Sequence, residues 1–194
     1  MSIKWKGSIL VTNVYIAHGY HANKNKHWFK WLKNALEIEG HDVKIIEFPN
    51  TDTPDVEEWL NALHEQVTSI NSDTLFVAHS LGVITTLKFI NDSKVPLIGG
   101  IAMVSGFKDH LVHLPELNPF VEQNVDFESL KQKLNHRFCI ASKDDDIVPY
   151  TYTENLSHLL DAKLYTIEHG GHFCEEDGYE TFNFLKQKII LKLD

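Results

Sequence analysis

The chain contains a serine, a run of acidic residues and a histidine in the order and contexts that nucleophilic catalysis requires. The serine is Ser80, within the five residues Ala-His-Ser-Leu-Gly that separate an apolar run from a helical pattern. At such a strand-to-helix turn the serine backbone is strained and its hydroxyl projects above the sheet, which requires small residues two positions away on either side. Gly82 meets this requirement, and Ala78 stands where glycine is usual. A serine that merely caps a helix would also fit these five residues, but the context favours a nucleophile.

A serine hydroxyl is a weak nucleophile, so this interpretation predicts an orienting acid and then a basic histidine farther along the chain. Three consecutive aspartates, residues 144–146, follow one strand-like run. Such a run is more often a solvated loop, but its position after a strand favours one of the three as the acid. His172 follows the next strand-like run, behind two glycines that let the loop bend over the sheet edge toward Ser80. His169 is a competing base that lies nearer to the strand.

The same pattern predicts where the developing negative charge would be bound. The first apolar run ends in His18-Gly19-Tyr20, where a fold of this type has one of its two oxyanion donors. We therefore expect the backbone N–H groups of Tyr20 and Leu81 to form an oxyanion hole. His79 is adjacent to the serine in sequence, but we expect its side chain to point elsewhere and to serve in packing.

The other histidines and the cysteines predict neither a metal centre nor a disulfide framework. Four histidines lack the spacing of metal ligands and are assigned to surface or loop positions: His21, His27, His110 and His113. Two cysteines are too few for a disulfide framework, and Cys139 lies inside an apolar run, as a small core residue would. The sequence therefore predicts no metal and no cofactor.

Six short apolar runs alternate with longer helical patterns and would supply the framework for these side chains. The runs are residues 9–17, 43–48, 74–78, 97–104, 137–141 and 163–167. Most are nearly continuous in apolar residues, as strands are when helices cover both faces of a parallel sheet. The alternation predicts an α/β protein with a three-layer, doubly wound, mostly parallel sheet, in a single domain over residues 1–194. Sites in such sheets gather at the carboxyl ends of the strands, where all the candidate residues would lie.

Two of the segments between these runs show how the helices would begin and end. One carries apolar residues at helical spacing from Trp28 to Leu36 and stops before Gly40, so Trp28 itself is expected in the core. The other extends from Val56 to Ile70, with Thr53 as its N-cap and Pro54 at its first helical position.

Composition and charge restrict the partners. Of the 194 residues, 43% are hydrophobic and 23% are charged, a balance typical of globular proteins. The formal charge of −9 argues against nucleic acid or an anionic membrane as the main partner and says nothing about catalysis. The small-molecule acyl substrate is expected from the candidate catalytic residues. Residues 4–17 loosely resemble a signal peptide, but the apolar run is short and Asn13 interrupts it, so we expect a cytoplasmic protein.

Several stretches of the chain, spread over nearly its whole length, resemble a family of small serine hydrolases that includes bacterial YdeN and a vertebrate retinoblastoma-binding member. They are residues 18–20, 27–29 with 31–33, 78–82, 104–107, 141–145 with 147–149, and 169–173. The resemblance implies a minimal α/β-hydrolase fold with little or no cap domain and a Ser-Asp-His triad. It also implies which aspartate is the acid, because the Asp-x-x-Val-Pro pattern of the family falls on Asp145, with Asp144 as the nearest rival.

These observations lead to two hypotheses of function. In the favoured one, the chain is a carboxylesterase-like serine hydrolase: Ser80 attacks a small ester, thioester or amide, His172 removes the hydroxyl proton, and Asp145 orients the imidazole. In the alternative, the chain is a hydrolase-fold protein that binds or regulates with little or no turnover, since a fold alone does not establish an activity. Residues 106–127 would form either a lid or a surface connection with one short helix, and the substrate would carry a small or short acyl group.

Overall fold

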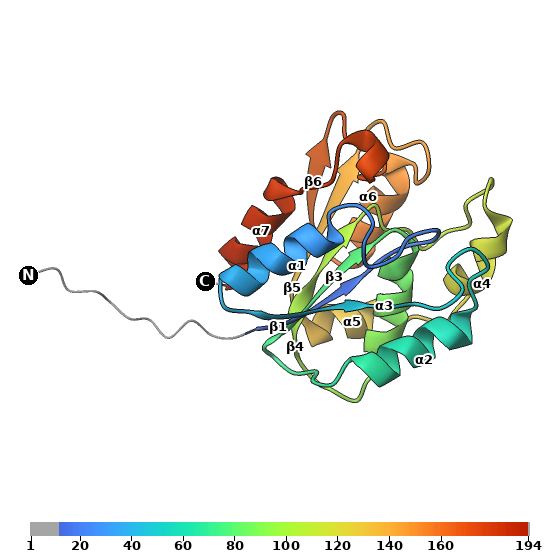
Figure 1. Cartoon of the computed structure of the whole chain (residues 1–194). Coiled ribbons are helices and arrows are strands. Elements are labelled where there is room, and N and C mark those ends of the chain that lie inside the picture. The colour runs from blue at the N-terminus through green and yellow to red at the C-terminus, as the bar shows by residue number, and fades with distance from the viewer. Residues whose placement is uncertain (1–11, 194) are drawn as a thin grey trace, which may run out of the picture.

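Six strands form one parallel sheet in a computed structural model that describes residues 12–193 (Figure 1). The strands are β1 (Asn13–Ala17), β2 (Asp42–Ile46), β3 (Thr74–His79), β4 (Ile98–Val104), β5 (Leu134–Ser142) and β6 (Lys163–Ile167). They lie in the order β2-β1-β3-β4-β5-β6, and each neighbouring pair is parallel. The predicted α/β class and its strands are confirmed, except that residues 9–11 of the first apolar run lie outside the described residues.

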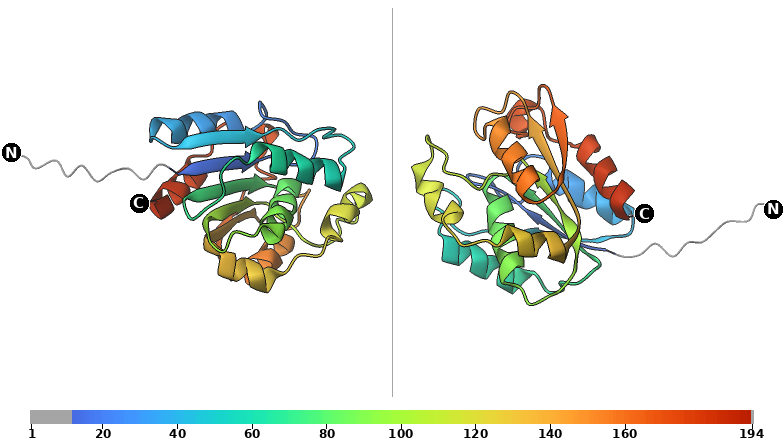
Figure 2. Two further views of the ribbon diagram at one scale, coloured as in Figure 1. Left: turned by 90° about the horizontal axis from the view of Figure 1, so that it is seen from below. Right: turned by 180° about the vertical axis from the view of Figure 1, so that it is seen from behind.

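Helices cover both faces of the sheet, as Figures 1 and 2 show. On one face lie α1 (Phe29–Ile38) and α7 (Asn183–Leu193). On the other lie α2 (Val56–Gln66), α3 (Leu81–Asp92), α5 (Phe127–Lys133) and α6 (Tyr150–Leu159). Each face has its own buried apolar cluster, so the three predicted layers are confirmed. Trp28 is fully buried in the cluster under α1, as its spacing predicted. Among the helices of residues 12–193, none combines the length and hydropathy needed to cross a bilayer.

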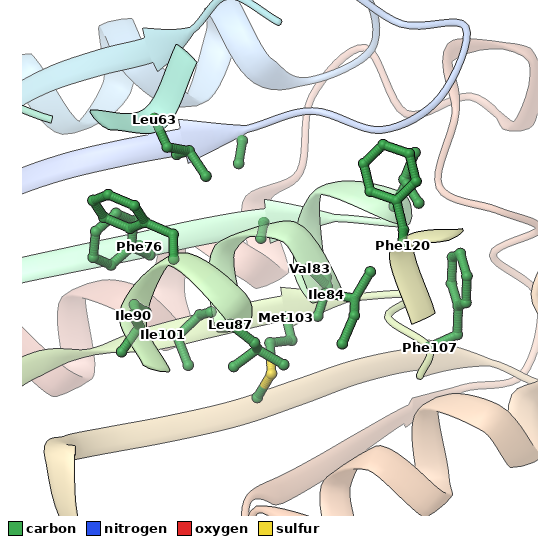
Figure 3. Packing of buried hydrophobic residues seen from close by; sticks show 14 of the residues in the cluster. Leu63, Phe76, Val83, Ile84, Leu87, Ile90, Ile101, Met103, Phe107 and Phe120 are labelled. Carbon is green, nitrogen blue, oxygen red and sulfur yellow. The ribbon is translucent and has the colours of Figure 1, made fainter. Parts of the chain in front are cut away.

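The central elements β3 and α3 are buried on nearly every side. Every residue of β3 is buried, and α3 buries both polar and apolar positions along most of its length. Ile84 and Leu87 of α3 and Met103 of β4 belong to one apolar cluster (Figure 3). Because burying one such side chain contributes about 1.5–3 kcal/mol, the core strongly restrains both elements. The turn that joins them is therefore held by the packing on each side of it.

The sheet reverses its winding direction between β1 and β3. From β1 the chain crosses to β2 on one side, and then returns past β1 to build β3 and the remaining strands on the other side. Loops that leave the carboxyl ends of β1 and β3 diverge at this point, and open α/β sheets bind their ligands in the crevice that such a divergence leaves. Ser80 follows β3 and residues 18–20 follow β1, so both lie at this switch point.

The two predicted helix ends have different outcomes. Gly40 stops α1 as expected: its φ of 98° lies in the left-handed region, and its N–H donates to the carbonyl of Glu37. The predicted start of α2 is wrong, because the N-cap is Asp55 and not Thr53. The Asp55 carboxylate accepts the N–H of Glu58 at 3.0 Å, and the helix begins at Val56. Both cap residue types are suitable, so the side chain that reaches a free N–H determines the start.

The predicted length of this helix is also wrong, since α2 ends at Gln66. Val67 has an extended backbone, yet Val67 and Ile70 still pack against the apolar cluster on that face. Apolar residues that continue to pack after a helix has stopped keep its apparent periodicity, which is why the pattern overran the end.

Residues 106–127 form a covering layer that is anchored to the core. They include a 3₁₀ turn, η1 (Pro115–Leu117), and one short helix, α4 (Asn118–Val121). Four apolar side chains of this layer are buried in the same cluster as α3: Phe107, Leu111, Leu117 and Phe120. The ring of Phe120 lies edge-on to that of Trp59 on α2, with centroids 5.4 Å apart. The segment thus contains the one short helix that the surface-connection hypothesis expected, and whether it also acts as a lid stays a prediction.

The corrected helix start makes a testable prediction. Replacing Asp55 with alanine removes the acceptor of the Glu58 N–H, and we expect this to lower the free energy of unfolding by about 1 kcal/mol. Thr53→Ala is the matched control and should change the free energy of unfolding by no more than a few tenths of a kcal/mol. Urea denaturation of both variants measures this difference. An equal loss in the two variants would contradict the assignment of the cap.

Candidate active site

Ser80 sits on a strained turn between β3 and α3. Its φ of 54° and ψ of −125° are rare for a residue with a side chain, and its N–H donates to the carbonyl of Val104 at 2.9 Å. Two glycines make room for the turn. A Cβ on Gly82 would lie 2.4 Å from the carbonyl oxygen of His18, and one on Gly19 would lie 2.8 Å from the Cβ of Ser80. The backbone therefore packs so closely around the serine that residues without a side chain are required at these two positions.

The structure brings the three predicted side chains together in one hydrogen-bonded line. Oγ of Ser80 lies 3.0 Å from Nε2 of His172, and Nδ1 of His172 lies 2.9 and 3.1 Å from the two carboxylate oxygens of Asp145. An ionised carboxylate only accepts hydrogen bonds, so Nδ1 carries the imidazole proton and Nε2 is free to accept from the serine. We refer to Ser80, His172 and Asp145 as the candidate triad. The side chains of Asp145 and His172 are only 1% and 10% exposed, which shields this line from water.

Other donors hold the Asp145 carboxylate in place. One oxygen accepts the N–H groups of Ile147 and Val148 at 3.0 and 2.8 Å, and the other accepts the hydroxyl of Ser105 at 2.7 Å. Ser105 is fully buried directly after β4, with a φ of 46°. Sequence reasoning gave Ser105 no role. The signal that was present is a polar residue at the carboxyl end of a buried strand.

The rival residues Asp144 and His169 lie outside the candidate triad and pair with each other. Nδ1 of His169 is 3.2 Å from an Asp144 oxygen, and the His169 side chain is 88% exposed. The other Asp144 oxygen accepts the N–H groups of Gly170 and Gly171 at 3.0 and 2.9 Å and the hydroxyl of Ser142 at 2.6 Å. Asp144 is therefore placed to hold the loop that carries His172.

A second carboxylate holds the same loop from its other end. One oxygen of Asp177 accepts the N–H groups of His172 and Cys174, at 2.9 and 3.1 Å. A Cβ on Gly171 would lie 2.3 Å from this carboxylate, and the φ of Gly171 is 52°, so glycine fits this position for two reasons. Of the two glycines predicted to bend the loop, Gly171 thus also makes room for the Asp177 carboxylate that restrains it.

The backbone N–H groups of Tyr20 and Leu81 are available as donors. Within residues 12–193 neither group has a hydrogen-bond partner, and each belongs to a residue next to the contact between Gly19 and Ser80. The Tyr20 hydroxyl points to the covering layer and donates to Glu116 at 3.1 Å. Free N–H groups beside a nucleophile are what an oxyanion hole requires. The assignment of Tyr20 and Leu81 to this role stays a prediction.

Folding also brings together a set of metal-compatible donors that sequence spacing had not indicated. Ligand atoms of His27, Cys174 and Glu176 lie within 4.8 Å of one another. Two of the three already have other interactions in the folded chain. Nδ1 of His27 accepts the N–H of Glu175 at 3.1 Å, and burial together with the carboxylates around it raises the pKa of the Cys174 thiol to about 12.

The loop contacts of Asp144 predict how stability depends on pH. Hydrogen bonds from Ser142, Gly170 and Gly171 hold the pKa of the Asp144 carboxyl well below its ordinary value of 3.8. Because the folded pKa lies below the unfolded one, this group stabilises the fold above the unfolded pKa, and the contribution is lost as the pH falls toward the folded pKa. From about pH 5 to about pH 3, the free energy of unfolding should therefore fall more steeply for wild type than for Asp144→Asn. Urea denaturation at each pH measures both slopes, and equal slopes would contradict the prediction.

Comparisons with known proteins agree with this fold. A family model described as serine hydrolase matches residues 14–189. YdeN of Bacillus subtilis (strain 168) is 39% identical over 171 residues, which are 88% of this chain and 90% of YdeN. The serine hydrolase RBBP9 of Rattus norvegicus is 23% identical over 164 residues, which are 84% of this chain and 86% of RBBP9.

Solved structures extend the comparison to three dimensions. The crystal structure of YdeN matches with a TM-score of 0.91 and 37% identity, over 94% of this chain and 98% of that one. Est1E from Butyrivibrio proteoclasticus matches with a TM-score of 0.71 and 14% identity, over 96% of this chain and 90% of that one, which is a likeness of fold. The resemblance found in the sequence and the α/β-hydrolase fold that it implied are confirmed. This chain belongs to the serine hydrolase family.

Proposed function

We propose that this protein cleaves a small ester, thioester or amide through an acyl-enzyme on Ser80. The observation that carries the proposal is the hydrogen-bonded line from the Ser80 hydroxyl through His172 to Asp145, with separations of 3.0 and 2.9 Å. A base at this distance from a hydroxyl is within reach of its proton, and the carboxylate on the far nitrogen keeps the imidazole in the tautomer that accepts it.

The reaction would proceed in two halves. As Oγ of Ser80 bonds to the substrate carbonyl carbon, its proton passes to Nε2 of His172, and the carbonyl π electrons move to the oxygen. The N–H groups of Tyr20 and Leu81 bind that oxyanion. When the tetrahedral centre collapses, the leaving group takes the proton from His172 and the acyl group stays on the serine. Water then attacks with His172 as the base and releases the acid, and the groups that move protons in these steps are the chain's own residues.

The covering layer supports a small acyl group as the substrate. Phe107 and Leu111 are only 1% and 3% exposed, so their side chains fill the core and do not line a long open groove. Trp28 is fully buried on the opposite face of the sheet and belongs to the packing there. Short acyl groups need little apolar surface beside the nucleophile, which agrees with a layer that is already packed.

The nucleophile can be tested directly with a fluorophosphonate probe, which bonds covalently to activated serines. Wild type should be labelled stoichiometrically at Ser80, and Ser80→Ala should not be labelled, because the nucleophilic oxygen is then missing. Ser93→Ala, at the end of α3, is the matched control and should label like wild type. Intact-mass spectrometry measures the adduct. Labelling that survives Ser80→Ala would refute the assignment of the nucleophile.

The two neighbouring aspartates give a sharper test of the acid. Asp145→Asn should lower kcat for p-nitrophenyl acetate by roughly 10⁴-fold, because an amide on Nδ1 favours the wrong imidazole tautomer. Asp144→Asn leaves the candidate triad intact and should lower kcat far less. Steady-state kinetics of both variants measure this ratio. A larger loss of kcat in Asp144→Asn than in Asp145→Asn would show that the assignment of Asp145 as the acid is wrong.

Turnover itself separates an enzyme from a hydrolase-fold binding protein. We expect wild type to release many equivalents of p-nitrophenol from p-nitrophenyl acetate, because His172 is also placed to activate the water that deacylates Ser80. Stopped-flow absorbance followed by steady-state measurement resolves the two phases. A burst of one equivalent with no further release would favour the binding protein.

A further inference from the structure

We propose that His79 is a positioning residue, whose ring N–H holds the backbone carbonyl of His172 and thereby sets the distance between the base and the nucleophile. This inference rests on the proposed function, since it concerns the same base and the same serine. His79 was expected only to pack. It does pack among aromatic rings, but it also makes a hydrogen bond that packing does not require.

The hydrogen bond is short and buried. Nε2 of His79 lies 2.8 Å from the carbonyl oxygen of His172, and the residue is only 2% exposed. A carbonyl oxygen only accepts, so Nε2 carries the ring proton and is the donor. His79 directly precedes Ser80 in the chain. One side-chain hydrogen bond therefore joins the residue next to the nucleophile to the residue that supplies the base.

The other ring nitrogen supports this role. Nδ1 of His79 is buried and, within the described residues, has no hydrogen-bond partner. A buried acceptor without a partner destabilises a fold, and an apolar side chain of similar size would avoid that loss. Packing against Trp28 and Phe29 alone would be served better by such a side chain. The contribution that is particular to imidazole at this position is the bond to His172.

His79 remains a neutral donor while His172 gains and loses its proton. Burial lowers the pKa of His79 well below its ordinary value, and the nearby His172 lowers it further. The centroids of the two rings are 4.8 Å apart. A positive charge on both rings at this distance would be strongly unfavourable. The bond from His79 to the His172 carbonyl therefore persists in both states of the base.

This carbonyl has no comparable second donor among the described residues. Its other contact is the thiol of Cys174, a weak donor, at 3.8 Å. The next carbonyl along, that of Phe173, is held by the indole N–H of Trp28 at 3.1 Å. Asp144 and Asp177 hold the N–H groups of the same loop. Removing His79 thus frees the one polar backbone group of His172 that the carboxylates do not hold.

Two substitutions separate the hydrogen bond from the packing. His79→Leu keeps a similar volume but has no donor, whereas the amide of His79→Gln can donate to the same carbonyl. We expect His79→Leu to lower kcat for p-nitrophenyl acetate by about 10- to 100-fold with little change in KM, because a base displaced by a fraction of an ångström transfers the proton less well. His79→Gln should keep most of the wild-type kcat. Phe89→Leu, a core substitution on α3 away from the loop, controls for a general loss of stability.

A second measurement does not depend on activity. Native-state amide hydrogen exchange reports on the N–H groups of His172 and Cys174, which the structure shows bonded to Asp177. We expect their exchange to be faster in His79→Leu and close to wild type in His79→Gln. If wild type fails to label at Ser80, the proposed function fails, while the exchange data still test the positioning role.

The outcomes that overturn the proposal are specific. Wild-type kcat and wild-type exchange in His79→Leu would overturn it, and so would a loss of kcat in His79→Gln as large as that in His79→Leu. Should His79→Leu not fold, His79→Gln decides by itself. A folded glutamine variant with protected loop amides and a strongly reduced kcat would show that the hydrogen bond is not what matters.

Discussion

The separation of 3.0 Å between Nε2 of His172 and Oγ of Ser80 is the constraint that the rest of the site serves. Ser80 follows β3 and His172 follows β6, and β4 and β5 lie between them in the sheet. Neighbouring strands are about 4.8 Å apart, so the loop after β6 must reach back over roughly 14 Å of sheet edge. A loop that extends this far cannot hold a side chain to a fraction of an ångström unless its backbone is held at several points.

Buried or charged side chains, most of them from distant elements, provide those points. Asp144 after β5 binds the N–H groups at the start of the loop, and Asp177 binds those around His172. The ring N–H groups of His79 and Trp28 donate to two consecutive carbonyls of the same loop, those of His172 and Phe173. Backbone N–H groups of the loop thus donate to carboxylates, and two of its carbonyls accept from ring N–H groups. These hydrogen bonds restrain an irregular segment as ladder hydrogen bonds restrain a strand.

The nucleophile is positioned by different means. Ser80 follows directly on a buried strand and precedes a buried helix, so apolar packing sets its position. The same packing holds both elements in place and thereby maintains the strained backbone of the serine. Close approach of the β1 backbone at Gly19 and Gly82 completes the turn. The serine is therefore rigid because of the core, whereas the histidine is rigid because of hydrogen bonds.

The sequence by itself determined the α/β class and the strands, and it indicated Ser80 and His172 as the candidate nucleophile and base, because buried strands, strand-to-helix turns and glycine-bent loops leave patterns within a few neighbouring residues. It also named Asp145, but only through the family resemblance. Only the tertiary structure decided which aspartate meets the imidazole, that Asp55 caps α2, and that Ser105 and His79 contact the candidate triad. The contacts of Asp145, Ser105 and His79 join residues that are far apart in the chain, and the packing of strands and helices sets their separation in space. The Asp55 cap is a local contact, decided by which of two suitable residues reaches a free N–H. Spacing along the chain does not fix distances between such remote residues, so a local pattern could at most mark Ser105 as a polar residue after a buried strand without naming its partner.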